Sequence, residues 1–183
     1  MKRKFCDNSL SLAVCISLLL TASCHTSRKS GSDFYRQQIE QLASDLKKDG
    51  KHHPKSSKVR KKIVDEAYSW LGTPYAYSKA EKGVATDCSG MVLEVYGKVT
   101  GVKLPRNSAR QAEFCKSIRP DDVAIGDLVF FATGRDKDVI SHVGIMVDDR
   151  NFIHASASKG VVVSDVTQPY YIRTFRGFGR VDF

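Results

Sequence analysis

The stretch ATDCSGMVLEVYG, residues 85–97, places a cysteine directly before an apolar run. The apolar residues that follow have the spacing of a helix: Met91, Val92, Val95, Tyr96 and Val99. This spacing predicts a helix that begins at Cys88 and ends near Gly101. A thiol at a helix N-terminus meets the positive end of the dipole and unpaired backbone N–H groups, which favour the thiolate and can hold an oxyanion. Cys88 is therefore a candidate nucleophile, and an inert core thiol is the alternative.

Two further helices are predicted around this one. Residues 59–72 carry apolar residues on one helical face, followed by a glycine placed as a stop: Val59, Ile63, Ala67, Trp70 and Gly72. Residues 107–114 form a short helix capped by Asn107 or Ser108. Five short β-rich segments follow, at 127–133, 142–147, 151–156, 160–164 and 178–182. Helices followed by a cluster of strands predict an α+β fold with an antiparallel sheet.

A thiol nucleophile needs a base, and two histidines on successive predicted strands are the candidates. If Val147 pairs with Asn151 across a tight turn, His154 lies opposite Gly144. His142 and His154 then share one face of the sheet as diagonal neighbours, about 7 Å apart. A register shifted by one residue places them on opposite faces. In the expected register, His142 is the base, and His154 orients it and fixes its tautomer.

Two other readings of the cysteines and histidines are open. A disulfide between Cys88 and Cys115 is one, because both follow an N-terminal segment that, as described below, directs export to an oxidising compartment. A zinc site formed by Cys88, His142 and His154 is the other, since all three are good ligands. No Cys-x-x-Cys pair accompanies them, so we expect neither a metal nor a cofactor.

The N-terminal residues look like a targeting segment. Basic residues precede an apolar run of 11 residues at 10–20, which is too short to span a bilayer and fits a secretory signal. Small residues before Cys24 resemble a bacterial lipobox. We expect residues 1–23 to be a lipoprotein signal peptide and Cys24 to carry the lipid, with an ordinary signal peptide as the alternative. The protein is then exported and anchored to a membrane, facing the periplasm or the cell wall.

The next segment, residues 24–57, is polar and basic, and we expect it to be a tether. It contains one amphipathic stretch at 33–48, which predicts a short helix. The catalytic domain is expected at 58–183. The formal net charge of +9 favours anionic partners such as a cell-wall polymer or acidic lipid. Basic residues interleaved with aromatic ones are not found, so we expect no nucleic acid partner.

Five motifs together resemble, in order, those of the NlpC-family cell-wall cysteine peptidases. They are TDCSG (86–90), LPRNSARQ (104–111), GDLVFF (126–131), SHVGIMV (141–147) and FIHAS (152–156). The similarity covers roughly residues 59–183 and extends to small single-domain murein endopeptidase lipoproteins. It implies a papain-like α+β fold, in which N-terminal helices pack on an antiparallel sheet.

The resemblance also implies roles for particular residues. It makes Cys88 the nucleophile, His142 the base and His154 the third member of a triad, in agreement with the reasoning above. It implies that Tyr75 assists the oxyanion, although the residues after Tyr75 depart from the family pattern.

Three further residues belong to the substrate cleft in this resemblance. Asp87 and Ser89 match positions that line the cleft, where Asp87 meets an ammonium group of a stem peptide. Arg106 either holds the carboxylates of the stem peptide or donates hydrogen bonds within the protein, and the sequence favours neither role.

The activity implied is hydrolysis of peptide bonds in murein stem peptides or crosslinks, through an acyl-enzyme. A catalytically silent wall-binding lipoprotein is one alternative, and an amidase or acyltransferase on the same scaffold is another. The expected partners are peptidoglycan and, through the lipid, a membrane. We expect the protein to act as a monomer.

Overall fold

The computed structural model describes residues 58–183. The expected signal peptide, the lipidation site Cys24 and the expected tether at 24–57 lie outside the described residues. Among the helices of the described part, none has the length and apolar character needed to cross a membrane.

The first described helix, α2 (Lys58–Tyr68), is the helix predicted at 59–72, but it ends earlier. The chain leaves the helix after Tyr68 and turns to Gly72, which has a positive φ of 79° and donates its N–H to the carbonyl of Val161. Ile63 and Ala67 are fully buried, as predicted. Val59 is 36% exposed because it lies in the first turn, so its assignment to the buried face was wrong.

The helix predicted after Cys88 is confirmed as α3 (Cys88–Thr100). The Asp87 carboxylate caps its start by accepting from the N–H of Gly90, and Gly101 ends it in the left-handed conformation. The short helix is confirmed as α4 (Ser108–Phe114), with Asn107 as its cap. Both helices were predictable because the residues that cap them lie directly next to their ends in the sequence.

The strands form a six-stranded antiparallel sheet in the order β3-β8-β4-β5-β6-β7. Their bounds are β3 (Lys116–Ile118), β4 (Leu128–Phe131), β5 (His142–Met146), β6 (Asn151–Ser156), β7 (Gly160–Asp165) and β8 (Phe175–Arg180). Four of the predicted strands correspond to β4–β7. The fifth, predicted at 178–182, begins earlier and ends earlier as β8, and β3 was not predicted.

Four smaller elements were also missed: the hairpin β1 (Ala80–Glu81) and β2 (Ala85–Thr86), the 3-10 helix η1 (Pro120–Asp122) and the helix α5 (Pro169–Thr174). Strands of two residues are too short to show an alternating pattern. The hairpin directly precedes Asp87 and Cys88 in the chain.

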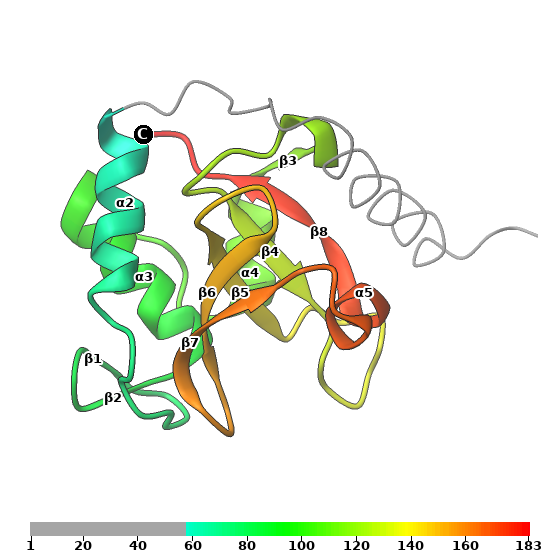
Figure 1. Cartoon of the computed structure of the whole chain (residues 1–183), viewed down its shortest axis with the longest axis horizontal. Helices are drawn as coiled ribbons and strands as arrows, with labels where there is room; N and C mark the ends of the chain where they lie inside the picture. Colours follow the sequence, from blue (N-terminus) through cyan, green and yellow to red (C-terminus); the bar gives the residue numbers. More distant parts are fainter. Residues whose placement is uncertain (1–57) are drawn as a thin grey trace, which may run out of the picture.

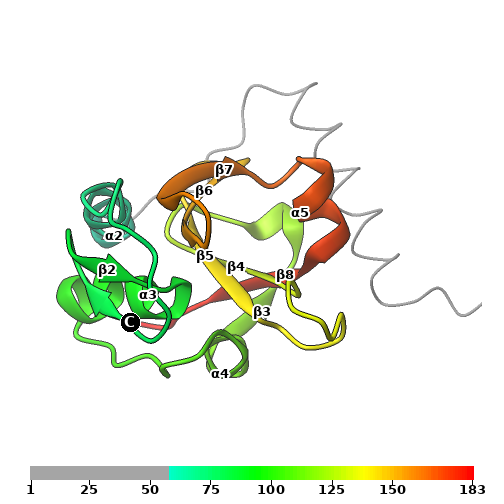
Figure 2. The same cartoon turned by 90° about the horizontal axis from the view of Figure 1, so that it is seen from below.

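The sheet has an apolar layer on each face. On one face, α2 and α3 pack through Ile63, Met91 and Val95 against strand residues such as Ile145 and Ile153. The other face has an aromatic cluster that includes Phe131, Phe152 and Phe175, with Tyr171 of α5 against it. Figures 1 and 2 show α2 and α3 on one side of the sheet and α5 on the other. This arrangement confirms the predicted α+β class.

Candidate active site

Cys88 is the first residue of α3 and lies where that helix meets the sheet. It is buried, with 8% of its surface exposed. The backbone N–H of Val143, at the start of β5, faces the sulfur together with the N–H groups of Ser89 and of Cys88 itself. The thiol therefore lies against the strand that begins with His142.

The start of α3 is held by the buried carboxylate of Asp87. This carboxylate accepts from the backbone N–H of Gly90 at 2.7 Å and of Ser78 at 2.8 Å. It also accepts hydrogen bonds from both terminal guanidinium nitrogens of Arg106, at 2.8 and 2.9 Å. Burial alone raises the pKa of Asp87, but the bonds from Arg106 and Gly90 hold it below its usual value. The carboxylate next to the thiol is therefore ionised, and both of its oxygens accept hydrogen bonds from within the protein.

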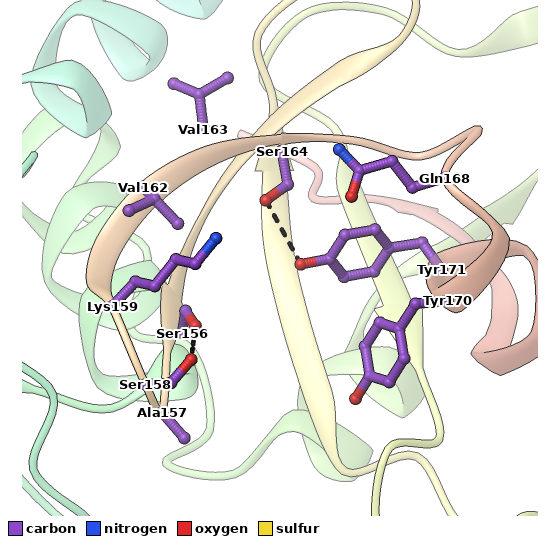
Figure 3. Close-up of a pocket in the computed structure, with 10 residues that line it drawn as sticks. All are labelled: Ser156, Ala157, Ser158, Lys159, Val162, Val163, Ser164, Gln168, Tyr170 and Tyr171. Carbon is purple, nitrogen blue, oxygen red and sulfur yellow. Dashed lines mark hydrogen bonds between the residues drawn. The ribbon is translucent and has the colours of Figure 1, made fainter.

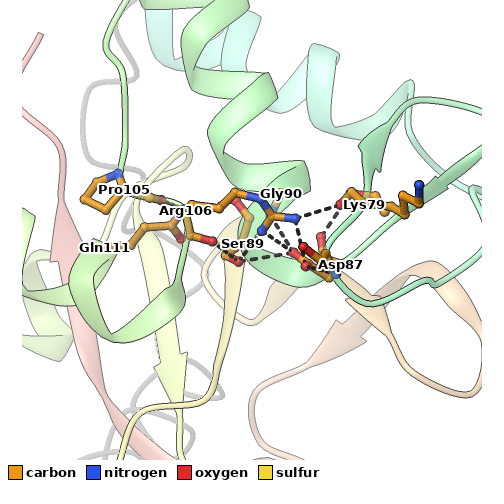
Figure 4. Close-up of polar contacts among 9 residues, drawn as sticks. Lys79, Asp87, Ser89, Gly90, Pro105, Arg106 and Gln111 are labelled. Atoms are coloured by element: carbon orange, nitrogen blue, oxygen red, sulfur yellow. Dashed lines mark hydrogen bonds and ion pairs between the residues drawn. The ribbon is translucent and has the colours of Figure 1, made fainter.

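Arg106 joins this carboxylate to two neighbouring segments. Its guanidinium donates to Ser89 Oγ at 2.9 Å and to the carbonyl of Lys79 at 3.1 Å, and Ser89 Oγ donates to the Arg106 carbonyl at 2.7 Å. Figure 4 shows the guanidinium between Asp87 and the Lys79 carbonyl. Of the two roles open for Arg106, the contacts favour the structural donor. Asp87 and Ser89, expected in the substrate cleft, bond to Arg106 and to α3.

Gly90 allows the close approach of these segments. A Cβ atom at this position would lie 2.5 Å from the Lys79 carbonyl oxygen and 3.1 Å from the Arg106 guanidinium. A side chain here would push the loop of Lys79 and Arg106 away from the start of α3. This packing role of the glycine in TDCSG was not predicted from the sequence.

The ionisation predicted for Cys88 is wrong. Burial raises the pKa of its thiol to about 11, and the negative charge of Asp87 acts in the same direction. The backbone N–H groups of Val143 and Ser89 lower the pKa, but burial outweighs them. Helix position was readable from the sequence, whereas the degree of burial was not. The resting thiol is therefore protonated.

The two histidines meet as the sequence analysis required. Ile145 pairs with Ile153, and the N–H of Val147 donates to the carbonyl of Asn151 at 2.9 Å, which sets the expected register. The Nε2 atom of His142 lies 2.8 Å from Nδ1 of His154, and the two rings are perpendicular, with an interplanar angle of 89°. The predicted juxtaposition of the two imidazoles is thus present.

Gly144, opposite His154, makes room for this contact. A Cβ there would lie 2.5 Å from the Phe152 ring and 3.2 Å from the His154 Cβ. Burial lowers the pKa of His142 to about 4 and that of His154 to about 3. Both imidazoles are therefore neutral at pH 7, so each carries a single N–H.

Two hydroxyl groups that the sequence analysis missed bond to the far side of His154. Its Nε2 lies 3.0 Å from Ser164 Oγ and 3.1 Å from the Tyr171 hydroxyl. The alternation of β7 offered a signal for Ser164, because it pairs with Phe152 and so shares a face with His154. We find no sequence signal for Tyr171, which comes from the unpredicted helix α5.

Tyr75 lies on the cysteine side of the site. It forms a single bridge to Thr86, just before the start of α3. Burial raises the pKa of its phenol, and the negative charge of Asp87 adds to this. Its hydroxyl therefore stays protonated and able to donate.

The alternative readings receive no support from the geometry. Cys88 and Cys115 are free thiols, so the disulfide reading does not hold. Within residues 58–183, no three His, Cys, Asp or Glu side chains are grouped to hold a metal ion.

Comparison with known proteins gives consistent matches. The model of the NlpC/P60 family matches residues 65–180. A "Probable endopeptidase" of Haemophilus influenzae is 39% identical over 114 residues, which are 62% of this chain and 69% of that protein. The murein DD-endopeptidase MepS/murein LD-carboxypeptidase of Escherichia coli is 35% identical over 127 residues, covering 67% of this chain and 63% of that protein.

A solved structure agrees with the fold. It is that of a Staphylococcus aureus protein described as similar to lipoprotein, of the NLP/P60 family. It has a TM-score of 0.62 and 30% identity, and the match covers 77% of this chain and 47% of that one. The matched part is therefore less than half of that longer protein.

Proposed function

This chain belongs to the NlpC/P60 family, and we propose that it is a cysteine peptidase that hydrolyses peptide bonds in peptidoglycan. One observation carries the proposal. His142, which lies 2.8 Å from His154 between ring nitrogens, directly precedes Val143, whose backbone N–H faces the Cys88 thiol at the start of α3. A thiol, a neutral imidazole and a group that orients the imidazole are the parts that nucleophilic catalysis requires. The name of the Haemophilus relative supports endopeptidase chemistry, and that of the Escherichia relative supports murein as the substrate.

The proton path follows from which imidazole nitrogens are occupied. His142 Nε2 is bonded to His154, so Nδ1 is the nitrogen left for the thiol. In the productive tautomer, His142 Nε2–H donates to His154 Nδ1, and His142 Nδ1 carries a lone pair. His142 Nδ1 takes the Cys88 proton as the sulfur attacks the carbonyl carbon of the substrate.

The second half of the reaction reverses this transfer. The imidazolium of His142 gives its proton to the leaving amine as the peptide C–N bond breaks, and an acyl thioester remains on Cys88. Water then attacks the thioester carbon and gives its proton to His142 Nδ1. The C–S bond breaks, the product leaves with its new carboxyl group, and His142 returns the proton to the Cys88 sulfur. Because the pKa of the thiol is raised to about 11 and that of His142 lowered to about 4, the proton rests on sulfur between turnovers.

We propose that hydrogen-bond donors beside Cys88 stabilise the oxyanion that forms during the reaction. The first N–H groups of a helix have no partner within it, which leaves those of Cys88 and Ser89 for a negatively charged oxygen. The Tyr75 phenol, kept protonated by burial, is proposed as a further donor. Asp87 and Arg106 are proposed to hold the helix start in place rather than to bind substrate, since their charges satisfy each other.

The site of action is proposed from the sequence. Residues 1–23 would direct export, and Cys24 would carry a lipid that holds the enzyme, as a monomer, at a membrane facing the wall. The description of the Staphylococcus relative as similar to lipoprotein supports this. The net charge of +9 also favours an anionic wall polymer.

Digestion of purified peptidoglycan sacculi tests the activity. The products released by the purified chain are identified by mass spectrometry. We expect new fragments cut within stem peptides or their crosslinks, with every sugar–peptide bond intact. Cleavage between sugar and peptide would show an amidase instead. Sedimentation of the chain with the sacculi without any product would show a wall-binding protein.

A further inference from the structure

The side of His154 away from His142 faces a pair of hydroxyl groups. Ser164 on β7 and Tyr171 on α5 both lie within 3.1 Å of His154 Nε2. The Tyr171 hydroxyl donates to Ser164 Oγ at 3.3 Å, as the dashed line in Figure 3 shows. We refer to Ser164 and Tyr171 as the hydroxyl pair.

The orientation of the His154 ring is already fixed by packing. His154 is 2% exposed, and its ring centre lies 4.8 Å from that of Phe152 and 5.7 Å from that of Tyr171. Tyr171 is itself held against Phe131, at 5.2 Å between ring centres. Packing therefore fixes the ring orientation, but it does not determine which nitrogen of His154 carries the proton. The hydroxyl pair is left to determine that.

This choice decides whether His142 can act as a base. With the His154 proton on Nε2, its Nδ1 accepts from His142 Nε2–H, and His142 Nδ1 keeps a lone pair for the thiol. With the proton on Nδ1, His154 donates to His142 Nε2, which forces the His142 proton onto Nδ1. In that state His142 has no lone pair to offer Cys88.

The hydroxyl pair favours the first state. When the Tyr171 hydroxyl donates its hydrogen to Ser164 Oγ, the phenol oxygen is left to accept from His154 Nε2–H. Ser164 also lines an open cavity of about 600 Å³, into which its own hydrogen can turn. Burial raises the pKa of the Tyr171 phenol and keeps it protonated.

Resting on the proposed function, we propose that the hydroxyl pair holds His154 in the Nε2–H tautomer and thereby keeps His142 competent as the base. Ser164 and Tyr171 are then positioning residues, which act on the reaction through His154. Ser164 matters as the acceptor for the phenol proton, since without it that proton turns toward His154 Nε2 and imposes the unproductive tautomer.

The test combines a double-variant cycle with nitrogen NMR of the ¹⁵N-histidine-labelled full chain at pH 7. For wild type we expect His154 protonated on Nε2. For Ser164→Ala we expect a shift toward Nδ1–H and a fall in kcat of about tenfold with KM unchanged, the size of one lost hydrogen bond. Adding Tyr171→Phe removes the misdirected donor, so the double variant should recover part of kcat.

Matched controls separate this role from packing. Ser164→Thr keeps the hydroxyl and should keep both tautomer and kcat. Tyr170→Phe makes the same change as Tyr171→Phe one residue earlier, on a half-exposed ring, and should change neither. Thermal unfolding of each variant shows that it is folded.

Two results would overturn the proposal. One is His154 protonated on Nδ1 in the wild type. The other is a double variant that is as slow as Ser164→Ala or slower, which is the result of a purely structural role. If the wild type cuts no peptidoglycan, the proposed function fails, while the NMR measurement still decides which nitrogen of His154 carries the proton beside the hydroxyl pair.

Discussion

The two halves of the site are held by different kinds of interaction. The helix half is charged, and three residues bond to one another around Cys88 at the start of α3: Asp87, Ser89 and Arg106. The sheet half is neutral, and its members come from β5, β6, β7 and α5: His142, His154, Ser164 and Tyr171. An ion pair fixes the position of the nucleophile, whereas neutral groups control where the proton goes. The difference suggests that damage to one half should cost mainly stability, and damage to the other mainly rate.

The largest effect is expected in the sheet half. His142→Ala should lower kcat by about a thousandfold, within the range of general acid–base catalysis, with little loss of stability. His154→Asn and His154→Gln still accept from His142 and should retain more activity than His154→Ala. Hydrolysis rates of soluble muropeptides measure this ranking. Equal losses in the three His154 variants would show that His154 does not act by orienting His142.

The helix half should respond in stability. Arg106→Leu leaves the Asp87 carboxylate, 7% exposed, without its cation. We expect a loss of about 2 kcal/mol of unfolding free energy, reduced from that of a fully buried pair because the Arg106 side chain is 41% exposed. Arg119→Leu is the matched control, because its pair with Asp122 is exposed, and it should cost less than about 0.5 kcal/mol.

The pH dependence of this loss has a defined sign. The pKa of Asp87 in the folded chain lies below its unfolded value of 3.8, so the stabilisation is present above that value. It disappears as the pH falls through the folded pKa. The difference in unfolding free energy between wild type and Arg106→Leu should therefore shrink below about pH 4. A difference that stays constant down to pH 2 would contradict the role given to Asp87.

A smaller effect is expected in the reactivity of the resting thiol. With the pKa of Cys88 raised to about 11, alkylation by iodoacetamide at pH 7 should be slower than that of a free cysteine. The rate should still be rising at pH 10. Peptide mapping follows Cys88 separately from the other cysteines. A rate that levels off below pH 7 would show a resting thiolate. The helix dipole would then outweigh burial in setting the pKa of Cys88.

The parts of the site that the sequence predicted depend on local signals. Asp87 caps the start of α3 and Gly101 ends it, each directly next to the helix, and the hairpin between the histidines is set by its own turn. The Asp148 carboxylate accepts from the N–H groups of Arg150 and Asn151, at 2.8 and 2.6 Å. A turn closed by its own residues fixes the register, and the register placed both imidazoles on one face.

The parts that were missed depend on distant residues. The thiol pKa is set by how deeply Cys88 is buried between helix and sheet, which no local pattern shows. The position of Arg106 over Asp87 joins residues 19 apart in the chain. Tyr171 reaches His154 from α5, a helix of six residues that is too short for a clear periodic signal.

Two cysteine variants test directly whether Cys88 is the nucleophile. Cys88→Ser places a far less acidic hydroxyl at the helix start, so it should stay folded and lose hydrolysis of peptidoglycan fragments. Cys115→Ser changes the other free thiol in the described domain, outside the site, and should retain the wild-type kcat/KM. If Cys88→Ser still cuts at the wild-type rate, or if chelators stop the reaction while thiol alkylation does not, Cys88 is not the nucleophile.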